Sequence, residues 1–120
     1  MIEIYLLLSI IVVVMSYRFM RVMVFFDLPV ETIENRRDYS RFRKLLIKNG
    51  FIMLQESVYC RMVLNQNVAT SVVSMVRSNK PPKGLVQILT ITEKQFSRME
   101  YVTGEYVNDV ISDDRRVVVL

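Results

Sequence analysis

The feature that most constrains this fold is the apolar segment at residues 20–29, MRVMVFFDLP. Its side chains are mainly apolar, β-branched and aromatic, which is typical of a strand buried on both faces. Pro29 ends the segment because proline has no N–H to donate to a neighbouring strand. We therefore predict a buried strand that ends near Asp27 and organises the rest of the chain.

Asp27 is the notable side chain of this segment. Burying a carboxylate at the end of a central strand costs free energy unless a cation pairs with it or a metal binds it. Two interpretations stay open from the residues alone. Asp27 either caps the following helix or pairs with a nearby arginine, or it is a functional residue with a metal as its partner.

Composition excludes several classes of site. The chain has no histidine, which removes histidine acid–base catalysis, His-ligated zinc and Ser-His-Asp schemes. Cys60 is the single cysteine, so an intrachain disulfide and a cysteine metal cluster are excluded. It lies in an apolar run and is predicted to be a buried, inert thiol. Carboxylates with a hard cation, chiefly Mg²⁺, remain as the metal chemistry.

The charge balance is basic. The 120 residues, enough for one domain, carry a formal net charge of +4, and eleven of the sixteen cationic residues are arginine. Arginine favours planar, bidentate contacts with phosphate. The balance is compatible with nucleic-acid binding and equally with an ordinary soluble protein.

The first residues form an apolar leader. At about 1.5 Å per residue, a helix over residues 4–14 falls short of a bilayer core of about 30 Å. The leader also lacks the basic region and cleavage site of a signal peptide. It is a membrane-leaning tail, an extra packed element, or translated sequence upstream of the true start. We favour the third because Met15 and Met20 both precede the organising strand. We expect a cytoplasmic protein without stable membrane association.

A basic helix follows the organising strand. Thr32 is the predicted N-cap, Tyr39 and Phe42 belong to the buried stripe, and Asn49-Gly50 ends the helix. Six cations lie outside that stripe: Arg37, Arg41, Lys44 and Lys48 on the opposite face, flanked by Arg36 and Arg43. Such faces are usually only solvated, but few acidic side chains neutralise this one, which favours nucleic-acid binding.

The remaining pattern predicts the fold class. We expect strands at 51–54 and 58–64, a helix from about residue 68 to 78, a break at 80–84, a strand at 85–92, a turn or short helix at 93–96, and further strands at 98–103 and 115–120. The order βαββαβ predicts a ferredoxin-like α+β fold with a four-stranded antiparallel sheet, two helices on one face and extra C-terminal strands.

The domains are then a leader at 1–14, the ferredoxin-like domain at 15–104, and an extension at 105–120. The strand at 117–120 has no obvious partner in this sheet, so we expect it to pair with a second protomer or another protein.

Four motifs in this order resemble those of a known family. They are VFFDLP at 24–29, RRDYSRFRK at 36–44, the Gly50-Phe51 turn with QESVY at 55–59, and ILTITEKQF at 88–96. From about Met15 onward the chain resembles the small CRISPR-associated spacer-acquisition proteins, often described as endoribonucleases. The last motif resembles the branch found beside the single-effector CRISPR nuclease. The leader at 1–14 departs from the family.

The resemblance implies a function in antiviral defence. It implies a homodimer in which Asp27 from each protomer binds one Mg²⁺, with Asp27 as the catalytic residue if the protein is a metal-dependent endoribonuclease or endonuclease. The family often has tyrosine before this aspartate, where this chain has Phe26. The resemblance also implies a scaffold that bridges the larger CRISPR integrase subunits and carries duplex DNA on its basic surface.

The third hypothesis, from fold alone, is an RRM-like single-strand RNA binder that stacks bases on Phe25 and Phe26.

Overall fold

The structure, a computed structural model, describes residues 2–104, without the side chains of residues 12–18. Its elements are α1 (Ile2–Arg18), β1 (Met20–Asp27), α2 (Ile33–Lys48), β2 (Ile52–Gln55), β3 (Val58–Val63), α3 (Gln66–Ser78), β4 (Leu85–Thr92) and α4 (Glu93–Phe96). From β1 to β4 this is the predicted βαββαβ order. The predicted strand at 115–120 and the extension at 105–120 lie outside the described residues.

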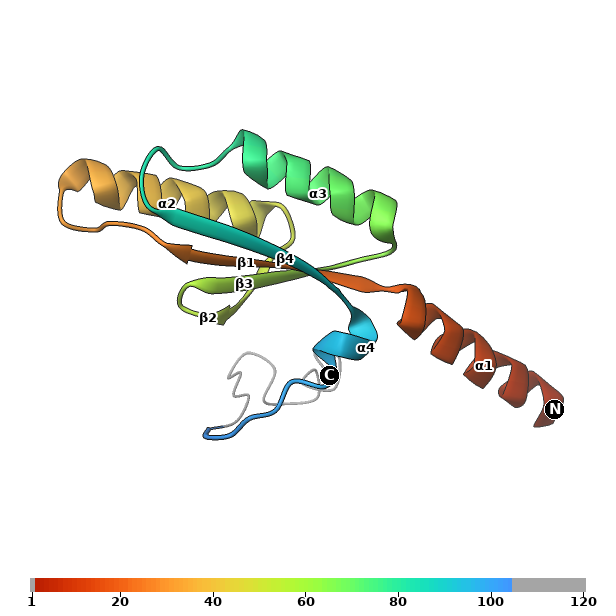
Figure 1. Ribbon diagram of the computed structural model, residues 1–120. Helices are drawn as coiled ribbons and strands as arrows, with labels where there is room; N and C mark the ends of the chain where they lie inside the picture. Colours follow the sequence, from red (N-terminus) through yellow and green to blue (C-terminus); the bar gives the residue numbers. More distant parts are fainter. Residues whose placement is uncertain (1, 105–120) are drawn as a thin grey trace.

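The four strands form one antiparallel sheet in the order β2-β3-β1-β4, with β1 between β3 and β4. Helices α2 and α3 cover the same face of this sheet (Figure 1). The ferredoxin-like prediction is therefore confirmed. β1 pairs with β3 as far as Phe25 and with β4 as far as Asp27, so the end of β1 at Asp27 is held by β4.

The basic helix α2 begins and ends where the sequence indicates. The Thr32 hydroxyl accepts a hydrogen bond of 3.0 Å from the Asn35 backbone N–H, which satisfies one of the free donors of the first turn. Asn49 is the C-cap, and Gly50 follows with a φ of +87°. That left-handed conformation suits glycine, and it turns the chain into β2.

The core lies between the sheet and the two helices. Val22 and Val24 of β1 are fully buried and pack with Leu46 of α2 and Val76 of α3. An aromatic cluster adjoins them around Phe26, whose ring stands edge-on to the rings of Tyr39 and Phe42 and stacks on that of Tyr59. Each such pair contributes about 0.5–1.5 kcal/mol beyond its buried area.

The predicted strand at 98–103 is wrong. Thr92 and Gln95 form a capping box that starts α4, and the turn continues because the amides of Ser97, Arg98 and Met99 bond to carbonyls of α4. The chain is therefore still turning where the strand should begin. Residues 99–104 are exposed and form no strand pairing with any described residue.

The predicted leader is helical. Residues 2–18 form α1, which projects from the body (Figure 1). The large apolar side chains described in residues 2–11 are more than half exposed, from 51% at Ile11 to 77% at Ile2. Among the residues that the structure describes, no helix is long and apolar enough to cross a membrane. The assignment of residues 1–14 as a dispensable leader stays a prediction.

Candidate metal site and nucleic-acid interface

Asp27 is exposed at the end of β1, where it lies opposite Leu85 of β4. Its carboxylate makes no hydrogen bond or ion pair with any residue of the described range 2–104. Thr32, not Asp27, caps α2. The two structural roles considered for Asp27, helix cap and arginine partner, are therefore wrong for the described part of the chain, and so is its expected burial.

The backbone at Asp27 is closely packed although its carboxylate is free. Gly84 has a φ of +97°, and a Cβ atom there would lie 2.7 Å from the Asp27 carbonyl oxygen and 3.0 Å from the Leu28 Cα. Arg36 donates to the carbonyls of Val30 and Glu31, at 3.0 and 3.2 Å. These contacts fix the loop that leaves β1. Sequence reasoning gave Gly84 no role here, although its place in the 80–84 break indicated a turn.

The described residues of one protomer do not supply a complete metal site. No group of three or more histidine, cysteine, aspartate or glutamate residues within the described range could hold a metal ion. The exposed Asp27 is a single hard oxygen ligand, of the type that Mg²⁺ prefers. The described residues therefore fit a metal only if ligands from outside this range join Asp27, and a second chain could supply them.

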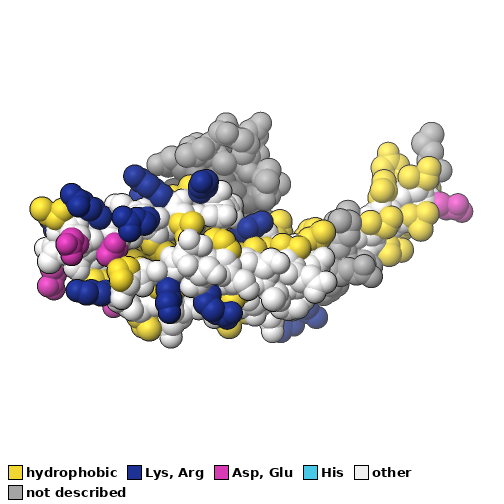
Figure 2. Space-filling view, turned by 90° about the horizontal axis from the view of Figure 1, so that it is seen from above, with side chains coloured by type: hydrophobic (Ala, Val, Ile, Leu, Met, Phe, Trp, Pro, Cys, Tyr) yellow, Lys and Arg dark blue, Asp and Glu magenta, His cyan; other side chains and the backbone are white. Residues whose placement is uncertain are grey.

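The six predicted nucleic-acid-binding cations are all exposed on α2. Figure 2 looks down on the helical layer, where basic side chains are spread widely and acidic ones gather at the end of the body where α2 begins. Arg41 approaches Asp38 at 3.6 Å, one turn away. Arg37, Lys44 and Lys48 make no hydrogen bond or ion pair with another described residue. We call Arg37, Arg41, Lys44 and Lys48 the basic stripe.

The two flanking arginines differ from the basic stripe. Arg36 is bonded to the loop carbonyls described above, and Arg43 donates from Nε to the Tyr59 hydroxyl at 2.8 Å. This hydrogen bond raises the pKa of Arg43 above its ordinary value. The helical spacing places six cations together but does not reveal that two have fixed partners. Tyr59 belongs to the QESVY motif at 55–59, but nothing in that motif indicates a contact with Arg43.

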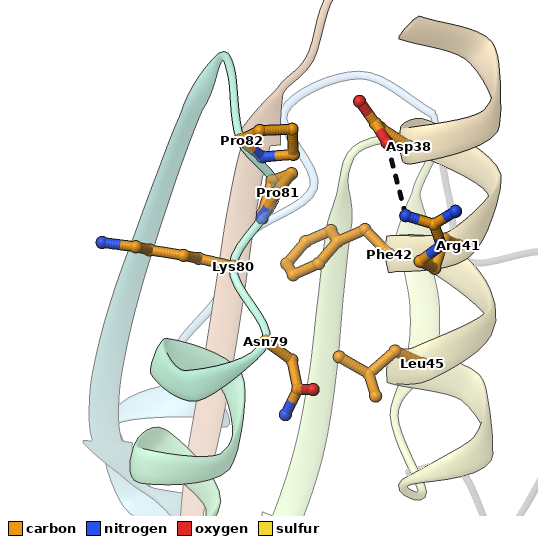
Figure 3. Close-up of a pocket in the computed structure, with 8 residues that line it drawn as sticks. All are labelled: Asp38, Arg41, Phe42, Leu45, Asn79, Lys80, Pro81 and Pro82. Atoms are coloured by element: carbon orange, nitrogen blue, oxygen red, sulfur yellow. Dashed lines mark ion pairs between the residues drawn. The ribbon is translucent and has the colours of Figure 1, made fainter. Parts of the chain in front are cut away.

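A small pocket lies beside the stripe. It has a volume of about 100 Å³ and lies between α2 and the segment 79–82. In Figure 3 the rings of Pro81 and Pro82 face the α2 side chains, whereas Lys80 extends away from them. Arg41 and Lys80 therefore do not converge on a common ligand, and the pocket shows no catalytic arrangement.

The opposite end of β1 carries a structural ion pair. Arg21 Nε lies 2.6 Å from Glu93 Oε2, and the guanidinium stands over the Phe96 ring at 4.2 Å from its centroid. Arg21 also lies 3.8 Å from the Cys60 sulfur. Cys60 is fully buried, as predicted, and burial raises the pKa of its thiol, which disfavours the reactive thiolate.

The fold and site define a ferredoxin-like α+β protein with a basic helical layer and an exposed carboxylate at the end of its central strand. The family profile of CRISPR associated protein Cas2 matches residues 20–99. This chain belongs to that family, and its function is CRISPR-associated.

Three relatives, each named CRISPR-associated endoribonuclease Cas2, show the extent of the similarity. The protein from Treponema denticola is 56% identical over 101 residues, covering 84% of this chain and 100% of the relative. That from Streptococcus mutans is 44% identical over 101 residues, covering 84% and 93%. That from Ligilactobacillus salivarius is 45% identical over 101 residues, covering 84% and 100%.

Proposed function

We propose that this protein acts in spacer acquisition as a homodimer that binds duplex DNA and bridges the larger integrase subunits. The observation that carries this proposal is the basic stripe, which is exposed and has one acidic partner, Asp38, among the described residues. Cations spaced along a helix surface suit successive backbone phosphates. Such binding depends on charge and duplex shape, because phosphate contacts position a protein without reading sequence.

Exposed apolar side chains on the second face of the sheet support a dimer. Strand alternation places Ile52, Met62, Leu85 and Leu89 on the side opposite α2 and α3, and each is 45–55% exposed. Apolar side chains gathered on one exposed face commonly mark a protein interface. A second copy of the chain is the partner that we propose for this face.

In this homodimer, Asp27 from each protomer would hold one Mg²⁺. Two facing carboxylates repel one another unless a cation lies between them, and a free, exposed carboxylate is available for that contact. Bound Mg²⁺ would supply a Lewis acid at a phosphodiester. Endoribonuclease activity, the activity named for the relatives, is therefore the second candidate function, with Asp27 as its catalytic residue.

The RRM-like alternative receives less support. Base stacking by that fold requires exposed aromatic side chains on the central strands. Phe26 is only 5% exposed and belongs to the core, so it cannot stack on a base. Phe25 is half-buried and is the one candidate left of the two.

Asp27→Asn tests which function is the main one. The variant and the wild type are purified with the integrase encoded beside the gene and assayed for integration and for Mg²⁺-dependent cleavage, with and without EDTA. We expect integration to survive and any cleavage to be abolished, because an amide cannot balance the charge of a hard cation. Loss of integration in Asp27→Asn would place the chemistry on this chain. Failure of the wild type to bind duplex DNA would contradict the scaffold proposal.

A further inference from the structure

The contact between Arg43 and Tyr59 joins the surface to the core. Tyr59 is fully buried in β3, yet its hydroxyl accepts a hydrogen bond of 2.8 Å from Nε of Arg43, an exposed residue of α2. The Tyr59 ring stacks on that of Phe26, with centroids 5.5 Å apart and planes 29° from parallel. The acceptor of this hydrogen bond is therefore held within the buried core.

The hydrogen bond to Tyr59 uses Nε of Arg43 and not its two terminal nitrogens. Nε is the donor to Tyr59, and the two terminal nitrogens make no hydrogen bond or ion pair with a residue of the described range. A guanidinium can grip a phosphate through a planar fork of donors. Anchoring one donor limits the side chain to few rotamers, so less conformational entropy is lost when a phosphate binds.

We propose that Tyr59 is a positioning residue, which orients Arg43 for contact with a backbone phosphate of the bound nucleic acid. This inference rests on the proposed duplex binding and assigns a distinct role within it. Arg43 is a pre-oriented contact, whereas Arg37, Lys44 and Lys48 are cations without a fixed partner among the described residues. Arg36 has both its bonds to loop carbonyls and belongs to neither group.

The experiment measures duplex-DNA affinity across a salt series for the full chain and its variants. Tyr59→Phe removes only the hydroxyl and changes no charge. We expect it to weaken binding by about two- to tenfold, the range for losing the orientation of one side chain. The salt slope of log K should stay nearly unchanged, because the number of cations is the same. Arg43→Ala should lower that slope by about 0.9.

Two further variants separate positioning from a structural role. If Tyr59 acts through Arg43, the double variant Tyr59→Phe with Arg43→Ala should bind no more weakly than Arg43→Ala alone. Tyr39→Phe is the matched control: it removes a hydroxyl from the same aromatic cluster, and Tyr39 contributes to the raised pKa of Arg43 without accepting its hydrogen bond. It should bind as the wild type does. Thermal unfolding of every variant reports on the fold independently.

Arg43→Lys extends the test without touching the core, which matters if Tyr59→Phe fails to fold. It keeps the charge but loses the fork, so it should also bind about two- to tenfold more weakly at an unchanged slope. Wild-type affinity in Arg43→Lys, or in a folded Tyr59→Phe, would overturn the inference and leave the hydrogen bond a purely structural one. Failure of the proposed function is distinguishable, because the wild type itself would then not bind duplex DNA.

Discussion

At the scale of single residues, the side chain and the backbone of Asp27 lie in different surroundings. Its carboxylate is exposed and has no partner among the described residues, whereas its carbonyl lies against Gly84. Changing the carboxylate should therefore alter chemistry with little effect on folding. Replacing Gly84, which lies against the carbonyl, should lower the stability of the fold.

Gly84→Ala tests the second half of that statement. The added Cβ meets the Asp27 carbonyl oxygen at 2.7 Å, and the φ of +97° is itself unfavourable for alanine. We expect the free energy of unfolding to fall by about 1–3 kcal/mol, measured by chemical denaturation. Gly50→Ala is the matched control, since Gly50 has a φ of +87° but its nearest contact, Arg61 Nε, is 3.5 Å away. Equal losses in the two variants would show that the close approach at Asp27 has no effect of its own.

At the scale of elements, α2 combines a buried stripe with two kinds of cation. Arg37→Ala with Arg41→Ala removes two members of the basic stripe. If both contact phosphate, the slope of log K against log salt for duplex DNA should flatten by roughly 1.8, or 0.9 for each contact. Fluorescence titrations over a salt series measure this slope. An unchanged slope would show that the face is merely solvated.

Arg36→Ala is expected to behave differently, because the Arg36 guanidinium bonds to the Val30 and Glu31 carbonyls. Loss of these hydrogen bonds should lower the thermal midpoint of unfolding. A hydrogen bond from a charged donor contributes about 1.5–3 kcal/mol to stability at most, and less when it is exposed. The salt slope should change less than in Arg43→Ala. A full loss of about 0.9 in the slope would instead return Arg36 to the phosphate contacts.

Elements with strong local signals could be predicted from the sequence. Thr32, Gly50 and the apolar stripe define α2 through interactions within a few residues, so its bounds agree with the structure. The strand predicted at 98–103 is wrong because the capping box at Thr92 starts a helix that keeps the chain turning. The hydrogen-bond partners of Arg36 and Arg43 lie in other segments of the chain, so the spacing of residues along α2 could not predict them.

At the scale of the whole molecule, the predictions on assembly concern the two ends of the chain. Expression from Met15 should give the same dimer with an unchanged thermal midpoint, because the fold from β1 to β4 is complete without α1. Light scattering and thermal unfolding measure both properties. Aggregation, or unfolding several degrees earlier, would make α1 a packed part of the protein.

The C-terminal residues 115–120 are predicted to pair outside their own sheet. β4 is an edge strand, so one row of its backbone groups has no strand partner within the described sheet. Deleting residues 115–120 should weaken assembly with a second protomer or the integrase while the βαββαβ core stays folded. Light scattering and pull-down measure assembly, and circular dichroism checks the core. Unchanged assembly would give this segment another role.

The exposure of the Asp27 carboxylate also bears on how this position can evolve. No described side chain depends on it for a hydrogen bond or an ion pair, whereas the adjoining backbone is tightly held. Selection for a folded protein therefore places little constraint on that carboxylate. A lineage could replace aspartate here in a single step and inherit an intact scaffold, so cleavage and architecture are free to evolve at different rates.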